Sequence, residues 1–286
     1  MFYDAHTHLN SDQLYPERQT YLERFVEKWG KWIVNVWVDS ERNERAIQIA
    51  EQAKQTYADS VFVKASIGIH PGEVSFGKIA SSQDIQKEIA WLEKLYQQHP
   101  EEIVAIWECG IDAHYANYEI HKPLQQELFH AHAQLAKKLE LPIIIHSRDH
   151  FADTMDVIQH YPELKVYFHC RGYTPEDIQL CAKQLPNLRV WFCGNITYPK
   201  AAPLRDSFQH ILEYNQHIAG NKQPIHILLE TDAPYLSPQS KRWQQNEPIN
   251  VIDIYAYVST HYSIPLEQLQ SILSTNFTHL YWKISY

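Results

Sequence analysis

Two histidines stand one residue apart near the start of the chain, in the stretch "DAHTHL", which contains His6 and His8. In an extended segment the side chains alternate between two faces, so these two imidazoles would point the same way and could reach one metal ion. A solvated N-terminal arm is the alternative, because a single H-x-H pair is only a moderate sign of a metal site. The choice depends on where the other metal-ligating residue types fall.

Further histidines and carboxylates follow short apolar runs, where strands are expected to end. His146 follows "III" and His169 follows "VYF", and either one could be a buried, hydrogen-bonded core histidine. Glu108, in "AIWECGID", is more informative, because a carboxylate at the end of an apolar strand is costly unless it is paired or coordinates a metal. The polar residues at such positions are His6, His8, Asp39, His70, Glu108, His146, His169, Asn195 and Asp232.

Chance explains part of this set, since the chain has 17 histidines and 34 acidic residues in 286 positions. Carboxylates at strand ends also cap the following helix, which is the role expected of Asp39 before "SERNERAIQIA". Asp232, in "LLETDAPYL", could likewise form a cap or a turn, with Glu230 as the ionic group. Imidazole is a poorer cap, so four histidine-bearing strand ends favour a shared site. Neutral histidines with carboxylates are typical of hydrolytic metal sites.

The elements that would carry these residues alternate along the chain. Each β-branched or aromatic run is followed by a longer amphipathic stretch, which predicts parallel strands joined by right-handed crossovers. We expect an α/β fold with one domain over residues 1–286, a (β/α)8 barrel of the TIM type, allowing for distortion, with extra C-terminal helices. An open doubly wound sheet is the alternative, but no G-x-G-x-x-G follows the first strand. In a barrel the reactive residues gather where the strands end.

The predicted strands are the runs 1–6, 32–38, 61–70, 102–110, 141–147, 164–170, 188–194 and 224–232. The predicted helices are the stretches 41–57, 82–98, 122–139, 151–161, 175–185, 202–214, 250–261, 265–274 and 276–283. We see no linker, low-complexity tract or change in composition that would divide the chain.

The composition describes a globular chain with a net negative charge. The apolar share of 44% allows a large core, and the formal charge of −9 argues against a surface that coats duplex DNA. It does not exclude a nuclease, because bound divalent ions would supply local positive charge. Four cysteines in so long a chain do not form a disulfide framework, which indicates a reducing compartment. With no signal peptide and no membrane-length apolar run, we expect a cytoplasmic protein without membrane contact.

The motifs of the chain resemble, in their order, the TatD family of metal-dependent deoxyribonucleases, within the amidohydrolase-like barrels. The resemblance extends from Asp4 to Pro248 and rests on "DAHTHL", "GIHP", "WECGID", "IIIHSRD", "FHC", "FCGNITYPKA", "LLETDAPYL" and "NEP". It implies one divalent ion on His6, His8 and Asp232, a second on His146 and His169, and Glu108 bridging the two. It also implies that Asp232 accepts the proton of the attacking water. The residues implied in orienting a phosphate or holding the site together are His70, Arg148 and Asn246.

Two such ions would lower the pKa of a bound water and offset charge on the phosphoryl oxygens. The donor set does not choose between magnesium, manganese and zinc. We therefore expect a deoxyribonuclease, exonuclease-like on DNA ends, with DNA or another phosphodiester as substrate and no obligate protein partner. An amide or ester hydrolase is the alternative, although Glu108 stands where many such barrels have a modified lysine. A barrel that binds metal or nucleic acid without turnover is less favoured, because no implied ligand is missing.

Several residues depart from the family pattern or invite a second interpretation. Trp107 stands where relatives usually have glycine, and "HCRGYT" places Arg171 and Tyr173 just beyond His169. These changes leave the ligand set intact but would reshape the pocket. The cysteines beside the strand ends, which we expect to be small packing residues, are Cys109, Cys170 and Cys193. The tyrosines near the loops, which could stack a base, are Tyr115, Tyr173, Tyr198 and Tyr235.

Overall fold

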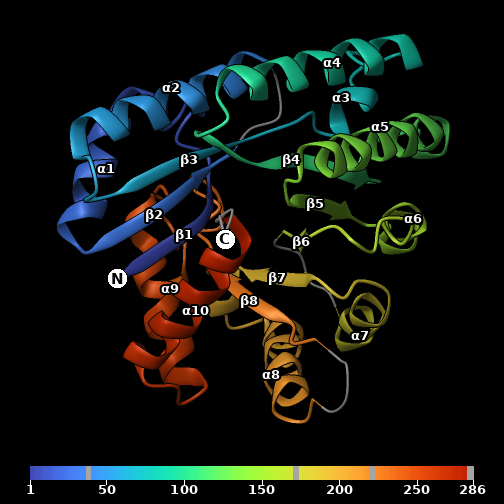
Figure 1. Ribbon diagram of the computed structural model, residues 1–286. Coiled ribbons are helices and arrows are strands. Elements are labelled where there is room, and N and C mark those ends of the chain that lie inside the picture. Colours follow the sequence, from blue (N-terminus) through green and yellow to red (C-terminus); the bar gives the residue numbers. More distant parts are fainter. Residues whose placement is uncertain (37–39, 170–173, 219–222, 282–286) are drawn as a thin grey trace.

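Eight parallel strands form a nearly closed barrel surrounded by helices in the computed structural model (Figure 1). The structure describes residues 1–36, 40–169, 174–218 and 223–281. The strands pair in chain order, so the predicted (β/α)8 barrel is confirmed. Their bounds are β1 Phe2–Thr7, β2 Gly30–Asn35, β3 Phe62–Ile67, β4 Ile103–Asp112, β5 Ile143–Arg148, β6 Val166–Phe168, β7 Leu188–Phe192 and β8 His226–Leu229.

The α-helices lie outside the strands (Figure 1). Their bounds are α1 Arg18–Glu27, α2 Ser40–Tyr57, α3 Gly72–Ser75, α4 Ser82–Gln98, α5 Tyr118–Leu139, α6 Phe151–Ile158, α7 Pro175–Gln184, α8 Ala202–Gln216, α9 Val251–His261 and α10 Leu266–Tyr281. The 3-10 turns are η1 Tyr15–Glu17, η2 Gly194–Thr197, η3 Gln239–Lys241 and η4 Pro248–Asn250. None of the described helices has the length and apolar character needed to cross a bilayer.

The helix predictions fail at two places. Where we expected two helices, over 265–274 and 276–283, the described residues form one helix, α10, over Leu266–Tyr281. The reason is that Leu269, Leu273, Phe277 and Leu280 continue a single buried stripe at helical spacing across the expected break. Helices α1 and α3 were not predicted at all, because α1 buries only two side chains and α3 is a single turn.

The barrel closes at the seam between β8 and β1. Thr7 forms an isolated parallel bridge with Ala233, and the amide of Asp232 donates to the carbonyl of His6 over 3.0 Å. Deeper in the seam, the buried carboxylate of Asp4 accepts from the amide and the hydroxyl of Thr231 at 2.8 and 2.6 Å. These bonds hold the first strand, β1, beside the last strand, β8. The segments "DAHTH" and "TDAP" therefore lie next to each other.

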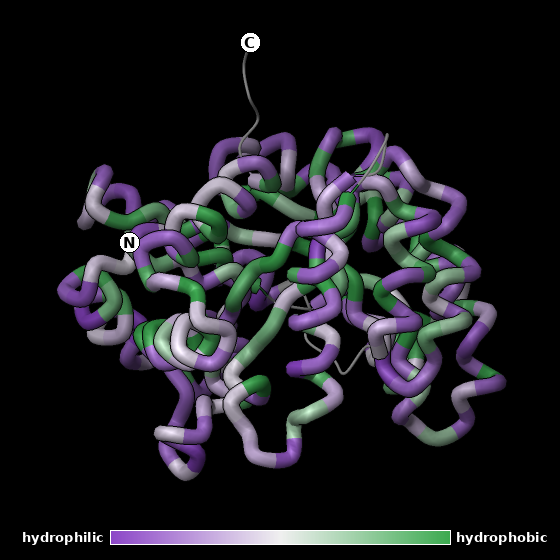
Figure 2. The backbone as a smooth tube through the Cα atoms, turned by 90° about the horizontal axis from the view of Figure 1, so that it is seen from below, coloured by the Kyte–Doolittle hydropathy of each residue, from purple (hydrophilic) through white to green (hydrophobic). Residues whose placement is uncertain are grey.

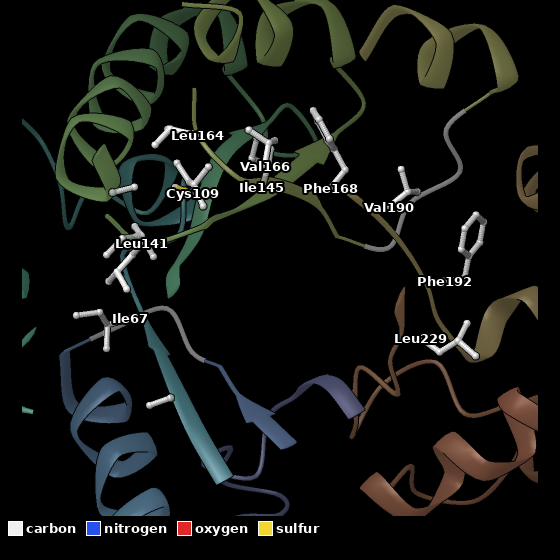
Figure 3. Packing of buried hydrophobic residues seen from close by; sticks show 14 of the residues in the cluster. Ile67, Cys109, Leu141, Ile145, Leu164, Val166, Phe168, Val190, Phe192 and Leu229 are labelled. Carbon is white, nitrogen blue, oxygen red and sulfur yellow. The ribbon is translucent and has the colours of Figure 1, made fainter. Parts of the chain in front are cut away.

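Apolar side chains on the outer side of the strands pack against the helices. Figure 3 shows Ile67, Ile145, Phe168 and Phe192 among the buried side chains around the ring of strands. Along the backbone, hydrophilic residues are frequent in the outer helices and loops, while hydrophobic stretches lie nearer the centre (Figure 2). This outer cluster fixes each strand against its helix and therefore fixes the positions of the strand ends.

A second apolar cluster fills the inside of the barrel. It contains Tyr3, Trp107, Tyr167 and Trp191 from the strands, together with Phe277 and other residues of α10. The ring centroids of Tyr3 and Phe277 lie 5.2 Å apart. The interior is thus a packed core rather than a channel, and the polar strand ends lie beyond it.

Candidate metal centre

Three donor atoms from the two sides of the seam meet in a small triangle. The Nε2 atoms of His6 and His8 are 3.1 Å apart, and each lies 3.2 Å from Oδ1 of Asp232. Donors that share one ion at about 2.0–2.2 Å lie about 2.8–3.4 Å from one another, so the triangle has the dimensions of one face of a coordination shell. All three side chains are buried, so water does not separate the atoms.

The tautomer of His8 agrees with a role as ligand. Its Nδ1 lies 3.0 Å from the carbonyl oxygen of Val36, which can only accept a hydrogen bond. Nδ1 therefore carries the proton and Nε2 presents a lone pair to the triangle. Burial, followed by the nearby His169, lowers the pKa of His6 to about 3, so the His6 imidazole is neutral as well. The Nε2 lone pair of His8 faces the carboxylate oxygen of Asp232 at 3.2 Å, an arrangement that is repulsive and that a cation between the two atoms would relieve.

His169 adds a fourth imidazole beside the triangle. Its ring stacks on that of His6 with centroids 4.1 Å apart, and its Nε2 lies 3.9 Å from Oδ1 of Asp232. Its Nδ1 lies 2.9 Å from Oε1 of the fully buried Glu230. Glu230 therefore orients His169 so that Nε2 points toward the centre. Burial alone would lower the pKa of His169, but the charges of Glu230, Asp232 and Glu108 outweigh it and raise the pKa to about 9.

His146 and Glu108 form the other side of the centre. Nδ1 of His146 lies 2.5 Å from Oε1 of Glu108, and its Nε2 lies 3.1 Å from Oδ2 of Asp112. Burial alone would lower the pKa of His146, but Glu108 and Asp112 outweigh it and raise the pKa, so both ring nitrogens donate, Nδ1 to Glu108 and Nε2 to Asp112. Asp112 thus orients the ring of His146, as Glu230 orients the ring of His169. Burial would raise the pKa of Glu108, but the charge and the hydrogen bond of His146, and more weakly the charge of His169, outweigh it and lower the pKa.

Glu108 therefore lies between the two groups of histidines. It contacts His146 directly, and its charge also acts on His169, which stacks on His6. The six residues predicted as ligands are thus brought into one buried region from β1, β4, β5 and the segments after β1, β6 and β8. The donor set of imidazoles and carboxylates suits divalent zinc, manganese or magnesium, as the sequence indicated.

A family model described as "TatD related DNase" matches residues 3–282. The chain belongs to this family. The resemblance found in the sequence motifs is therefore confirmed, and it extends over nearly the whole chain.

Relatives of this TatD-family chain are named as metal-dependent hydrolases or TatD homologues. The "Uncharacterized metal-dependent hydrolase YabD" of Bacillus subtilis is 28% identical over 283 residues, which cover 98% of this chain and 99% of the relative. The crystal structure of YjjV, a TatD homologue from Escherichia coli K12, has a TM-score of 0.78 at 22% identity, with 98% of this chain and 97% of that chain covered. A TatD-family hydrolase structure from Entamoeba histolytica gives 0.76 at 20% identity, with 98% of each covered. These structures share the fold.

The large side chain of Trp107 fits beside Glu108 because the strand pairing is irregular there. The register between β4 and β5 shifts between Ile106 and Cys109. Trp107 belongs to the inner cluster and Cys109 to the outer one, while Glu108 reaches His146 from the inner side. The shift thus allows two successive residues to face inward. The fully buried Trp107 ring lies edge-on to the His6 ring, with centroids 4.4 Å apart, and limits its rotation.

His70 lies beside Glu108, but its hydrogen bonding argues against a role as ligand. Its Nδ1 accepts a hydrogen bond from the amide of Gly72 at 2.9 Å, so the proton of the neutral ring is on Nε2. Burial lowers the pKa of His70 to about 4, which keeps the ring neutral. Nε2 lies 3.8 Å from Oε2 of Glu108, too far for a hydrogen bond. His70 therefore presents an N–H donor to the site.

Asn246 and Arg148, the other two residues implied in phosphate binding, differ in how they are held. Asn246 is fully buried, and its amide donates to the carbonyls of Thr231 and Tyr235 at 2.8 and 2.5 Å. These bonds hold the segment around Asp232, whose φ of 56° is in the left-handed region. The geometry thus favours a role for Asn246 in holding the site together. Arg148, at the end of β5, is partly exposed and remains a candidate for contact with a phosphate.

Two carboxylates that orient histidines were not assigned that role from the sequence. Asp112 was not predicted because β4 extends to residue 112, whereas we expected it to end at 110. The signal was present in "GID", where a second acid follows Glu108 at the same strand end. Glu230 was named only as a substitute for Asp232, yet it orients His169.

Some predictions fall outside the residues that the structure describes, namely those on Asp39, Cys170, Arg171 and Tyr173. Of the other cysteines, Cys109 and Cys181 are buried and free, as expected of packing residues. Cys193 is buried but disulfide-bonded, so the expectation that it is only a packing residue is wrong.

Proposed function

We propose that this TatD-family chain is a metal-dependent hydrolase that cleaves the phosphodiester bonds of DNA. The observation that carries the proposal is the single buried cluster of His6, His8 and Asp232 with His169, Glu108 and His146. The family description and the names of the relatives support it. The carboxylate at position 108, in place of a lysine, favours this reaction over amide hydrolysis.

We assign one divalent cation to His6, His8 and Asp232 and a second to His146 and His169, with Glu108 contacting both. Bound there, such cations would lower the pKa of a coordinated water and offset charge on the phosphoryl oxygens. The number and identity of the ions are part of the proposal.

The residues of the chain prepare the site in three ways. Val36, Glu230 and Asp112 each hold one imidazole by one ring nitrogen, so that the other nitrogen faces the centre and, once deprotonated, can offer its lone pair to a cation. Burial would raise the pKa of Asp232, but the neighbouring imidazoles of His6, His8 and His169 outweigh it and lower the pKa, so the carboxylate is ionised. We assign to this carboxylate the proton of the attacking water.

We place His70 and Arg148 on the substrate side. The Nε2–H of His70 is positioned to donate to a phosphoryl oxygen, and the guanidinium of Arg148 is suited to paired contacts with phosphate. Neither His70 nor Arg148 is assigned as a metal ligand. Loss of either should therefore weaken substrate binding without removing a metal ligand.

The test is a panel of substrates offered to the protein loaded with Mg²⁺, Mn²⁺ or Zn²⁺. The panel contains bis(p-nitrophenyl) phosphate, single-stranded and duplex DNA, RNA, a p-nitrophenyl ester and a dipeptide. We expect metal-dependent release of nucleotides from DNA and turnover of the small phosphodiester, both abolished in Glu108→Ala. Turnover of the ester or the dipeptide alone would overturn the proposal in favour of the amide or ester hydrolase.

A further inference from the structure

An exposed aromatic ring lies close to the candidate metal centre, on the segment after β3. Phe76, directly after α3, has 59% of its surface exposed. Its ring meets the partly buried ring of Tyr115 edge to face, with centroids 4.8 Å apart and an interplanar angle of 68°. Single exposed apolar residues are common, but here two aromatic rings from different loops form one continuous surface. We call Phe76 and Tyr115 the aromatic platform.

Hydrogen bonds fix the platform relative to the centre. The fully buried Gln125 of α5 accepts from the amide of Asp112 at 2.9 Å. Its Nε2 donates to the carbonyl of Asp112 at 3.1 Å and to the hydroxyl of Ser75, next to Phe76, at 3.3 Å. The turn that bears Phe76 is therefore tied to the residue that orients His146.

A second connection runs through His70. The amide of Gly72 donates to Nδ1 of His70, and the amide of Phe76 donates to the carbonyl of Gly72 at 2.8 Å. A Cβ atom at Gly72 would lie 3.3 Å from Cε2 of Tyr115, so Tyr115 packs directly on this turn. The platform and the proposed phosphate donor His70 are thus parts of one local structure.

The size and charge of the platform indicate its occupant. Two rings offer far less than the roughly 800 Å² that each partner contributes to a stable protein interface. Because the rings meet at 68°, one of them can lie flat on a nucleobase, and the exposed ring of Phe76, braced by Tyr115, has the size for it. The neighbouring Glu73 is paired with Lys78 at 2.7 Å, so its charge is offset. Burial and the carboxylates of Asp112, Glu108 and Glu73 raise the pKa of Tyr115, and the positive charge of Arg148 opposes them, so Arg148 lies within electrostatic range of the platform. The surroundings therefore suit an aromatic group attached to a phosphate.

We propose that the aromatic platform stacks with an unpaired nucleobase next to the scissile phosphate, so that the enzyme prefers single-stranded or frayed ends. This inference rests on the proposed nuclease function. Paired bases inside a duplex are already stacked on their neighbours and would not be available to Phe76. The platform thus determines specificity and is separate from the metal ligands.

The test compares Phe76→Ala with the unmodified enzyme on two single-stranded oligonucleotides. One has all its bases, and the other has abasic residues at the two positions nearest each end. Loss of stacking on an aromatic residue typically weakens nucleic-acid binding about 5- to 100-fold. We expect Phe76→Ala to lower kcat/KM by about that factor on the first oligonucleotide, mainly through KM, and by less than twofold on the abasic one. Phe76→Trp should restore activity, and Trp29→Ala, which removes an exposed ring before β2, should change neither value.

Equal losses on both oligonucleotides would indicate a structural role for Phe76, and no loss on either would show that no base stacks there; both results overturn the proposal. If the unmodified enzyme cleaves no DNA, the proposed function fails, and binding decides the stacking question separately. In that case, fluorescence anisotropy with Ca²⁺ and the same labelled oligonucleotides should show weaker binding of Phe76→Ala only to the oligonucleotide with bases. Equal binding of the variant and the unmodified protein would overturn the platform as well.

Discussion

Removing the carboxylate of Asp112 tests whether it orients His146. Asp112 is 1% exposed and accepts the Nε2 proton of His146, which is itself only 6% exposed. In Asp112→Ala that N–H has no acceptor and little access to water, which costs about 1–3 kcal/mol. Loss of such an orienting partner typically lowers metal affinity about 10- to 100-fold, or about 1.4–2.7 kcal/mol, in agreement with that cost. We therefore expect Asp112→Ala to weaken one class of metal site by this factor.

The assay is competition for Zn²⁺ or Mn²⁺ against a chromophoric chelator at pH 7.5, which resolves sites of different affinity. The site on His6, His8 and Asp232 should keep its affinity, because none of its donors contacts Asp112. Asp112→Asn keeps an acceptor oxygen and should lose less affinity than Asp112→Ala. Asp153→Asn is the matched control, since that buried carboxylate bonds to Tyr118 and Lys122 instead. Unchanged affinity at every site in a folded Asp112→Ala would refute the reasoning.

Three further predictions concern the ligands, the stability and the core. Glu108→Ala should abolish hydrolysis and weaken metal uptake while circular dichroism remains unchanged; full activity after chelation and reloading would contradict its bridging position. Removing metal with a chelator should lower Tm in proportion to the affinity lost, because the ion binds only the folded chain; an unchanged Tm in calorimetry would contradict a preformed site. Burial lowers the pKa of His132 to about 4, so the unfolded chain takes up the proton first as the pH falls. The free energy of unfolding should therefore drop by about 3 kcal/mol between pH 6.5 and 4 from His132 alone. Urea titrations of His132→Gln should show a flatter pH profile, and an identical profile would rule this out.

The barrel could be predicted from the sequence because one unit, a strand-like run followed by a helical stretch, recurs along the chain. Each β-branched run has a bounded length and is followed by an amphipathic stretch, so α4 was placed with its observed bounds and β5 to within two residues at each end. The break expected within α10 shows the limit, because a stripe of buried residues continues through Ser274 and Thr275 despite their low helix propensity.

The candidate site was predictable to the extent that chemistry depends on residue type. Imidazole and carboxylate groups at strand ends indicated a metal centre, and the structure brings them together. What could not be read from one sequence was the direction of each ring. Only three-dimensional contacts reveal that His70 accepts at Nδ1, that Asp112 holds His146, or that a register shift turns Trp107 inward.

The closure of the ring has a consequence for synthesis on the ribosome. His6 is translated 226 residues before its partner Asp232. At about 5–20 residues per second, this delay is about 11–45 seconds. Throughout that interval the growing polypeptide lacks one corner of the triangle of His6, His8 and Asp232, so a cation can bind there only after Asp232 has been made.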